Sequence, residues 1–131
     1  TLNNLGDLYR KQRKWQEAER CFDQSLAIKR ELGHRHGEAQ TLSNLGIAYE
    51  QQGKWQEAEG CYDQSLAILR ELGDRHGEGQ TLYNLALLRE AQGDVSAALE
   101  VVRDALSVLE TTEDTMSRDK AHAMIARWER A

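Results

Sequence analysis

Three asparagines recur at intervals of forty residues, at Asn4, Asn44 and Asn84. A carboxamide carries two N–H donors and an acceptor oxygen, so it can pair with both the N–H and the C=O groups of a peptide backbone. A row of such side chains has the chemistry to hold an extended polypeptide whatever its sequence. The alternative is that asparagine is a repeat consensus residue whose amide bonds only within the fold.

Other side chains capable of chemistry favour structural roles. Cys21 and Cys61 lie one repeat apart, which predicts a separation of about 10 Å, one helix-packing distance and beyond disulfide reach. Buried thiols that only pack are expected there. His34, His36 and His76 fall in turns, without the three or four convergent ligands that a metal requires. We therefore expect capping or surface histidines, no metal site and no cofactor.

Catalytic motifs are missing from the sequence. It contains no glycine-rich phosphate loop and no nucleophile elbow. The acid pairs Glu17 with Glu19 and Glu57 with Glu59 would point to different sides of a helix, because helical neighbours are three or four residues apart. We expect no enzymatic activity.

The elements that position these residues come from a forty-residue repeat. Residues 41–80 are identical to residues 1–40 at 29 positions without a gap, and a more diverged copy begins at Thr81. The chain has no proline and is rich in alanine, leucine, glutamate, glutamine and arginine, which favour helices. A fixed period of this length is typical of stacked repeat units. The sequence predicts an all-α fold.

Each repeat is predicted to form two helices. In residues 41–80 the first helix ends near Gln52, and Gly53 suits the left-handed conformation that closes a helix. The second helix runs from about Trp55 to Leu72, and Asp74 is the expected cap of the next helix. A single hairpin leaves apolar surface on more than one side, so the units must stack. The apolar stripe of the first helix is Leu42, Leu45, Ala48 and Tyr49.

The recurring positions resemble the tetratricopeptide signature. In that signature Leu, Gly and Tyr mark the first helix, and Ala, an aromatic residue and a small residue mark the second. The corresponding residues of the second repeat are Leu45, Gly46, Tyr49, Ala58, Tyr62 and Ser65. The forty-residue period is similar to that of kinesin light chains, Gα-binding polarity adaptors and bacterial regulatory arrays. Trp15 and Trp55 stand where the family places a bulky residue that wedges against the neighbouring helix.

This resemblance implies a right-handed superhelical solenoid of antiparallel helix pairs, with about three repeats and a C-terminal capping helix. We expect one domain over residues 1–131, with repeats 1–40, 41–80 and 81–114 and a capping helix at 115–131. Ala121, Met124, Ile125 and Trp128 have the spacing of one apolar helix face. The sequence opens in mid-pattern without an initiator methionine, so we expect a fragment of a larger protein.

In such arrays the first helices line a concave groove, and related proteins use the equivalent asparagines to grip peptide backbone. Helical spacing places further residues on the same side of each first helix as the asparagine. The predicted peptide-binding set is Asn4, Asn44, Asn84, Ser43, Tyr83, Ile47, Leu87, Gln40, Gln80 and Lys120.

The charge preference of the ligand is left open. Chaperone-binding members clamp a terminal carboxylate with Lys and Arg on first helices, but this chain has Gln40 and Gln80 where such charges would help. Arg35, Arg75 and Lys120 could still supply positive charge near the rim of the groove.

The charge and hydropathy of the chain limit its partners. A net charge of -5 does not favour the phosphate backbone, which needs a concentrated basic face, so no nucleic acid is expected. No apolar stretch approaches the ~20 residues that span a bilayer, so no membrane is expected either. A cytoplasmic protein that binds a protein or peptide, as a scaffold or signalling adaptor, is the leading hypothesis.

The alternative hypothesis is self-assembly. Thr1 starts directly in a first helix, which leaves Leu2, Leu5 and Leu8 without a preceding repeat to cover them. An apolar patch of this kind promotes association. We therefore also consider end-to-end stacking through the N-terminal repeat, without a ligand in the groove.

Overall fold

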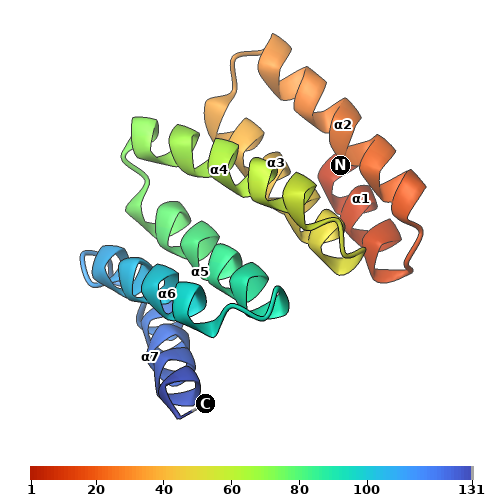
Figure 1. The fold of residues 1–131 in the computed structure, drawn as a ribbon. Coiled ribbons are helices and arrows are strands. Elements are labelled where there is room, and N and C mark those ends of the chain that lie inside the picture. The colour runs from red at the N-terminus through yellow and green to blue at the C-terminus, as the bar shows by residue number, and fades with distance from the viewer. Residues whose placement is uncertain (131) are drawn as a thin grey trace. The chain divides into compact units, whose positions relative to one another are not determined.

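The computed structural model describes residues 1–130, which form seven helices and no strand (Figure 1). The all-α prediction is confirmed, and the second helix of the second repeat has the predicted bounds. The helices are α1 (Leu2–Lys11), α2 (Trp15–Glu31), α3 (Arg35–Gln51), α4 (Trp55–Leu72), α5 (Arg75–Ala91), α6 (Val95–Leu109) and α7 (Thr115–Glu129).

The turn inside each hairpin closes its first helix in the same way. After α3, the N–H of Lys54 donates to the carbonyl of Tyr49 at 2.9 Å, and Gly53 takes a φ of 76°. Gly93 does the same after α5, with a φ of 81°. Glycine suits this left-handed conformation because it has no Cβ. After α1 the position is held by Arg13, with a φ of 60°.

Side-chain caps start the helices that follow most turns. The Nδ1 atom of His34 accepts a hydrogen bond from the N–H of Gly37 at 3.0 Å, and Asp74 accepts one from Gly77 at 3.0 Å. Such a cap satisfies an N–H group that has no partner within the helix. The predicted capping roles of His34 and Asp74 are confirmed.

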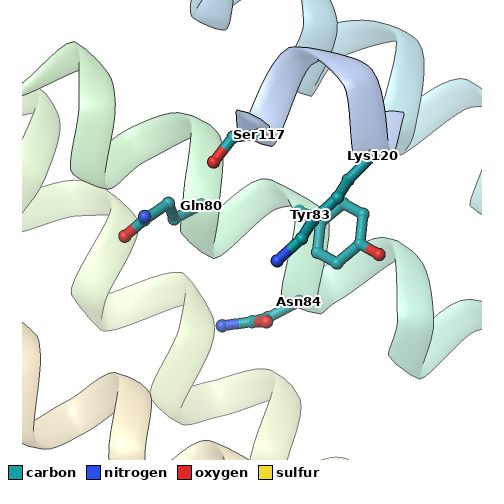
Figure 2. A pocket seen from close by; sticks show the side chains of 5 residues that line it. All are labelled: Gln80, Tyr83, Asn84, Ser117 and Lys120. Atoms are coloured by element: carbon teal, nitrogen blue, oxygen red, sulfur yellow. The ribbon is translucent and has the colours of Figure 1, made fainter. Parts of the chain in front are cut away.

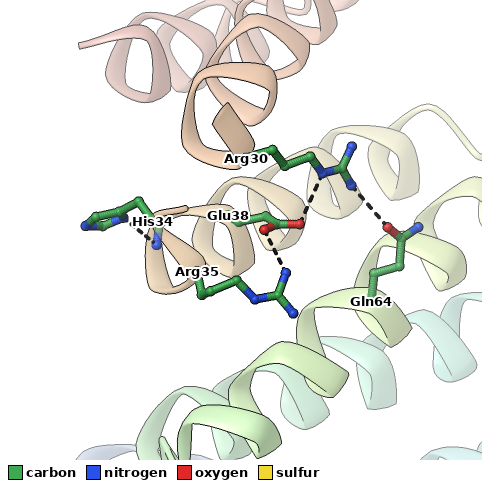
Figure 3. Close-up of polar contacts among 6 residues, drawn as sticks. Arg30, His34, Arg35, Glu38 and Gln64 are labelled. Atoms are coloured by element: carbon green, nitrogen blue, oxygen red, sulfur yellow. Dashed lines mark hydrogen bonds and ion pairs between the residues drawn. The ribbon is translucent and has the colours of Figure 1, made fainter. Parts of the chain in front are cut away.

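A buried glutamate ties each of two inter-repeat turns together. Glu38 in α3 is 6% exposed and accepts hydrogen bonds from Nε of Arg30 at 3.1 Å and from Arg35 at 2.9 Å (Figure 3). Glu78 in α5 is 5% exposed and pairs with Arg70 at 2.9 Å and Arg75 at 3.5 Å. Burying a carboxylate is costly unless it is paired, so these arginines are required by the fold.

The helices pack into two compact units, Thr1–Ile68 and the segment from Leu69 onward, so that the division falls within α4. In the first unit α2, α3 and α4 enclose a core that agrees with the predicted stripes: Ala18, Phe22, Leu45, Ala48 and Cys61, flanked by Tyr9 and Tyr49. Both cysteines are buried and free, as expected. Trp55 is 39% exposed, so more than half of its side chain is covered, and its wedging against the neighbouring helix stays a prediction. As the first residue of α4, it lies outside the core.

The second unit consists of α5, α6 and α7, together with the end of α4. Its core residues are Ala86, Ala98, Val102, Ala121 and Trp128, with Met124 and Ile125 packed against them. The indole N–H of Trp128 and the guanidinium of Arg127 both bond to the carboxylate of Glu90, which fixes α7 to α5. The predicted apolar face of the last helix is confirmed.

None of the helices described is long and apolar enough to cross a membrane.

Candidate polypeptide-binding site

A hollow in the second unit collects four of the predicted binding residues. It has a volume of about 250 Å³ and lies between α5 and α7 (Figure 2). Gln80, Tyr83 and Asn84 come from three positions on one side of α5, and Lys120 comes from α7. The fifth lining residue, Ser117, was not predicted. Its only sequence signal is its position three residues before Lys120, which places both on one side of α7.

The polar groups of this hollow are available to a ligand. Asn84 is half-buried and Lys120 is exposed, and within residues 1–130 neither side chain makes a hydrogen bond or an ion pair. The hydroxyl of Tyr83 is protonated at neutral pH, as in any tyrosine, and burial raises its pKa further, so it can donate. Gln80 lies 3.3 Å from His76, measured between their Nε2 atoms. The hollow offers amide, hydroxyl and ammonium donors to an acceptor.

A second hollow in the first unit contains the corresponding face of α1. Its volume is about 290 Å³, and two of the predicted residues, Asn4 and Gln40, line it. Asn3, the neighbour of Asn4, accepts a hydrogen bond from the hydroxyl of buried Thr41 at 3.1 Å. The side chain of Asn4 is exposed and has no such partner within the described chain. The remaining lining residues are Thr1, Leu2, Asn3, Ser25, Ile28 and Lys29.

The other predicted binding residues lie on α3 and α5. Asn44 is half-buried, and its side chain makes no hydrogen bond within residues 1–130. Ser43 lies 2.8 Å from Ser65, measured between their hydroxyl oxygens, and so takes part in bonding within the hairpin. Ile47 is half-buried, and Leu87 packs against the core of the second unit.

The three residues predicted to give the groove a positive rim differ in their partners. Arg35 and Arg75 are engaged by the buried carboxylates of Glu38 and Glu78, because those carboxylates would otherwise lie unpaired in the interior. Both arginines remain about half exposed, but the positive charge that they would bring to the rim of a groove is offset by a neighbouring carboxylate. Lys120 is the predicted rim cation that lines a hollow. Within the described residues, no three His, Cys, Asp or Glu side chains gather as a metal site would require.

Comparison of the sequence with protein families establishes what kind of protein this is. The family described as tetratricopeptide repeat matches residues 1–71 and 38–111. The chain belongs to the tetratricopeptide repeat family. Tetratricopeptide repeats generally mediate protein–protein interactions, and such proteins are typically scaffolds without enzymatic activity. A search of curated protein sequences found no match.

Solved structures with the same fold include three proteins of low sequence identity. BtubC (BKLC) from P. vanneervenii has a TM-score of 0.77 at 21% identity, over 98% of this chain and 61% of that one. The nearly identical TPR-like repeats described for a kinesin light chain of Podosopora anserina give 0.75 at 22%, over 98% and 64%. Aspartyl phosphate phosphatase F from Bacillus subtilis gives 0.91 at 16%, over 97% and 33%. This chain spans less than two thirds of each protein.

Proposed function

We propose that this chain binds a partner polypeptide through the asparagine-bearing sides of its first helices, which are α1 and α3 in the first unit and α5 in the second. The supporting observation is a contrast between neighbouring residues. Asn3 and Ser43 bond to groups inside their unit, whereas the next residues, Asn4 and Asn44, have side chains without a partner in the described chain. Buried polar groups are normally bonded within a fold, so the half-buried amide of Asn44, which makes no such bond, is available to a ligand.

The chemistry of the hollow in the second unit fits a peptide main chain. Asn84 can accept from a peptide N–H and donate to a peptide C=O. The ring of Tyr83 offers apolar contact, and Lys120 offers a charge to a carbonyl or a carboxylate. A net contribution of about 0.5–1.5 kcal/mol for each hydrogen bond means that three amides alone give weak binding. Affinity therefore also depends on apolar contacts such as that of Tyr83.

The experiment starts from dodecapeptides selected from a random display library against the unmodified chain. We expect the double variant Asn44→Ala with Asn84→Ala to keep its helical circular dichroism and thermal midpoint but to lose affinity for the selected peptides. The loss is expected to be about tenfold or more, since two hydrogen bonds are removed. The matched control is Gln56→Ala, which removes an exposed amide from α4, outside the hollows described, and should leave affinity nearly unchanged. Unchanged affinity in the double variant would reject the proposal.

Self-assembly through the first repeat is a second candidate, favoured by one observation. Leu5 and Leu8 in α1 are 40% and 51% exposed, whereas their counterparts in α3, Leu45 and Ala48, are 4% and 0% exposed. Apolar positions that are buried in the second repeat are thus exposed to solvent in the first. Multi-angle light scattering of the double variant Leu5→Glu with Leu8→Glu tests this. Any oligomer of the unmodified chain should dissociate in the variant. If the unmodified chain is strictly monomeric at high concentration, self-assembly is excluded.

The setting that we propose is a cytoplasmic scaffold or signalling adaptor. In this proposal residues 1–131 act as one binding domain of three repeats and a capping helix, within a larger protein. The family match over residues 1–111 supports the repeat organisation. Gel filtration and proteolysis of the full-length protein, which would release this segment as a stable fragment, test the domain assignment.

A further inference from the structure

Positive charge is concentrated at the turn between α1 and α2. Four of the five residues from Arg10 to Lys14 are cations, although the chain as a whole has a net charge of -5. Three of these cations line a hollow of about 590 Å³ in the first unit. The residues that line it are Arg10, Lys11, Arg13, Trp15, Gln51 and Gln52, and the carboxylate of Asp7 pairs with the first two of them.

The turn holds Arg13 in a backbone conformation that is unfavourable for a residue with a side chain. Arg13 has a φ of 60°, and it is the one described non-glycine residue with a positive φ. The equivalent positions of the next two hairpins are Gly53 and Gly93. A side chain in the left-handed region is strained because its Cβ crowds the following carbonyl. For the fold alone, glycine would be the better residue at position 13, and retained strain of this kind points to a function.

The side chain of Arg13 has no structural task that would explain the strain. It is exposed, and within residues 1–130 it makes no hydrogen bond or ion pair. Its neighbours differ, since Asp7 binds Arg10 at 2.6 Å and Lys11 at 3.3 Å. Lys14 lies 6.0 Å from the centroid of the Tyr9 ring. Arg13 therefore presents an uncompensated guanidinium at the edge of the hollow.

We propose that this hollow binds the anionic side chains of an acidic segment in a partner polypeptide, either clustered carboxylates or a phosphorylated residue. A guanidinium suits such groups because its fork of N–H donors matches two oxygens at once. Lys11 adds a second charge that is partly offset by its pair with Asp7. Trp15 provides contact surface, and Gln51, whose amide oxygen accepts from Arg10 at 3.1 Å, keeps its amide N–H groups for a ligand. The hollow lies at the turn, where Lys11 and Gln51 follow Asn4 and Asn44 by seven residues on the same sides of α1 and α3. It does not require the asparagines, so an acidic peptide that is weakened by Arg13→Gly but not by the asparagine double variant separates this proposal from the proposed function.

The charge distribution favours a polypeptide over nucleic acid. The cations form one hollow rather than a stripe, and the chain as a whole carries a charge of -5. A long polyanion would meet that negative field beyond the hollow, whereas a short acidic segment would not.

Three Gly-Ser dodecapeptides test the proposal. One carries two phosphoserines, one carries two glutamates, and one is unsubstituted. The readouts are calorimetry at two salt concentrations and the indole N–H resonance of Trp15 in the ¹⁵N-labelled chain. We expect at least one acidic peptide to bind. Its binding should shift the indole N–H resonance of Trp15 and leave that of Trp55 unchanged. Its affinity should fall with added salt. Whichever acidic version binds more tightly identifies the group recognised.

Arg13→Gly separates binding from folding. The variant should raise the thermal midpoint, because the strain is relieved, and should weaken the acidic peptide about tenfold, the usual effect of losing one charged hydrogen-bond partner. The control is Arg20→Gln, which removes an equal charge from the exposed side of α2 and should leave affinity nearly unchanged. Equal losses in the two variants, equal binding of the unsubstituted peptide, or tighter binding of a single-stranded oligonucleotide would overturn the proposal.

Discussion

Gly46 in α3 lies directly against the ring of Tyr62 in α4. A Cβ at Gly46 would lie 2.7 Å from Cε1 of Tyr62, closer than real Cβ atoms approach, and Gly6 stands in the same relation to Phe22 in the first hairpin. The ring of Tyr62 is fully buried. The absence of a side chain on α3 therefore allows the two helices to approach, which is why glycine and an aromatic residue recur together.

Gly46→Ala should lower the free energy of unfolding. Forcing a methyl group into a packed contact costs about 1–3 kcal/mol, which exceeds the gain of about 1 kcal/mol from the higher helix propensity of alanine. The two terms together give a net loss of about 0–2 kcal/mol, and the full burial of Tyr62 favours the upper end of this range. Urea unfolding followed by circular dichroism measures it.

Gly60→Ala is the matched control, because Gly60 also lies within a helix but has open space where a Cβ would be. This variant should gain about 0.5–1 kcal/mol from the loss of backbone freedom in the unfolded state. Similar effects of both substitutions would show that the contact with Tyr62 does not matter.

Glu38→Ala should weaken the joint between the first two repeats. It removes charge-assisted hydrogen bonds to Arg30 and Arg35, but both arginines are about half exposed and can turn to water. We expect a loss of about 1–2 kcal/mol, smaller than for a fully buried pair. The comparison is Glu129→Ala, which breaks an exposed pair with Arg103 and should cost under about 0.5 kcal/mol. Thermal unfolding measures both losses, and equal losses of stability in the two variants would contradict the structural role of Glu38.

Glu50 should make stability depend on pH. Burial raises the pKa of its carboxyl, although the hydrogen bond from the hydroxyl of Tyr62 partly offsets this. The folded state therefore holds this proton more tightly than the unfolded state, and its contribution to stability falls as the pH rises from the ordinary value through the raised one. Glu50→Gln keeps the acceptor for Tyr62 and removes the charge. Its free energy of unfolding should exceed that of the unmodified chain at pH 7 and match it near pH 3, and an equal difference at both values would refute this.

The thiol of Cys61 should react slowly in the folded chain. Burial, with the nearby charges of Asp23 and Glu57, raises the pKa of Cys61 to about 11. Only about one thiol in a thousand is then ionised at pH 8, and the thiolate is the reactive form. Labelling of the Cys21→Ala variant with a chromogenic disulfide should therefore show a long half-life that shortens sharply in urea. Rapid labelling without denaturant would mean that the site is open.

Local rules were sufficient to predict the helices. The glycines after first helices, the caps at His34 and Asp74 and the spacing of apolar residues act within a few residues, so their consequences can be deduced from the sequence. The structure confirms them. The grouping of Gln80, Tyr83, Asn84 and Lys120 could be anticipated only in part, because α7 has to fold back on α5 before Lys120 can join the other three.

The sequence by itself determined the repeat, the two-helix unit and the family, since a period, a helix propensity and a signature depend on spacing along the chain. Tertiary structure decided which polar groups are consumed by the fold. It buried Glu38 and Glu78 and so committed Arg35 and Arg75, and it exposed Trp55. It also left Arg13 strained and unpaired. These outcomes depend on which surfaces pack together, because burial determines whether a charge must find a partner within the protein or can remain in water.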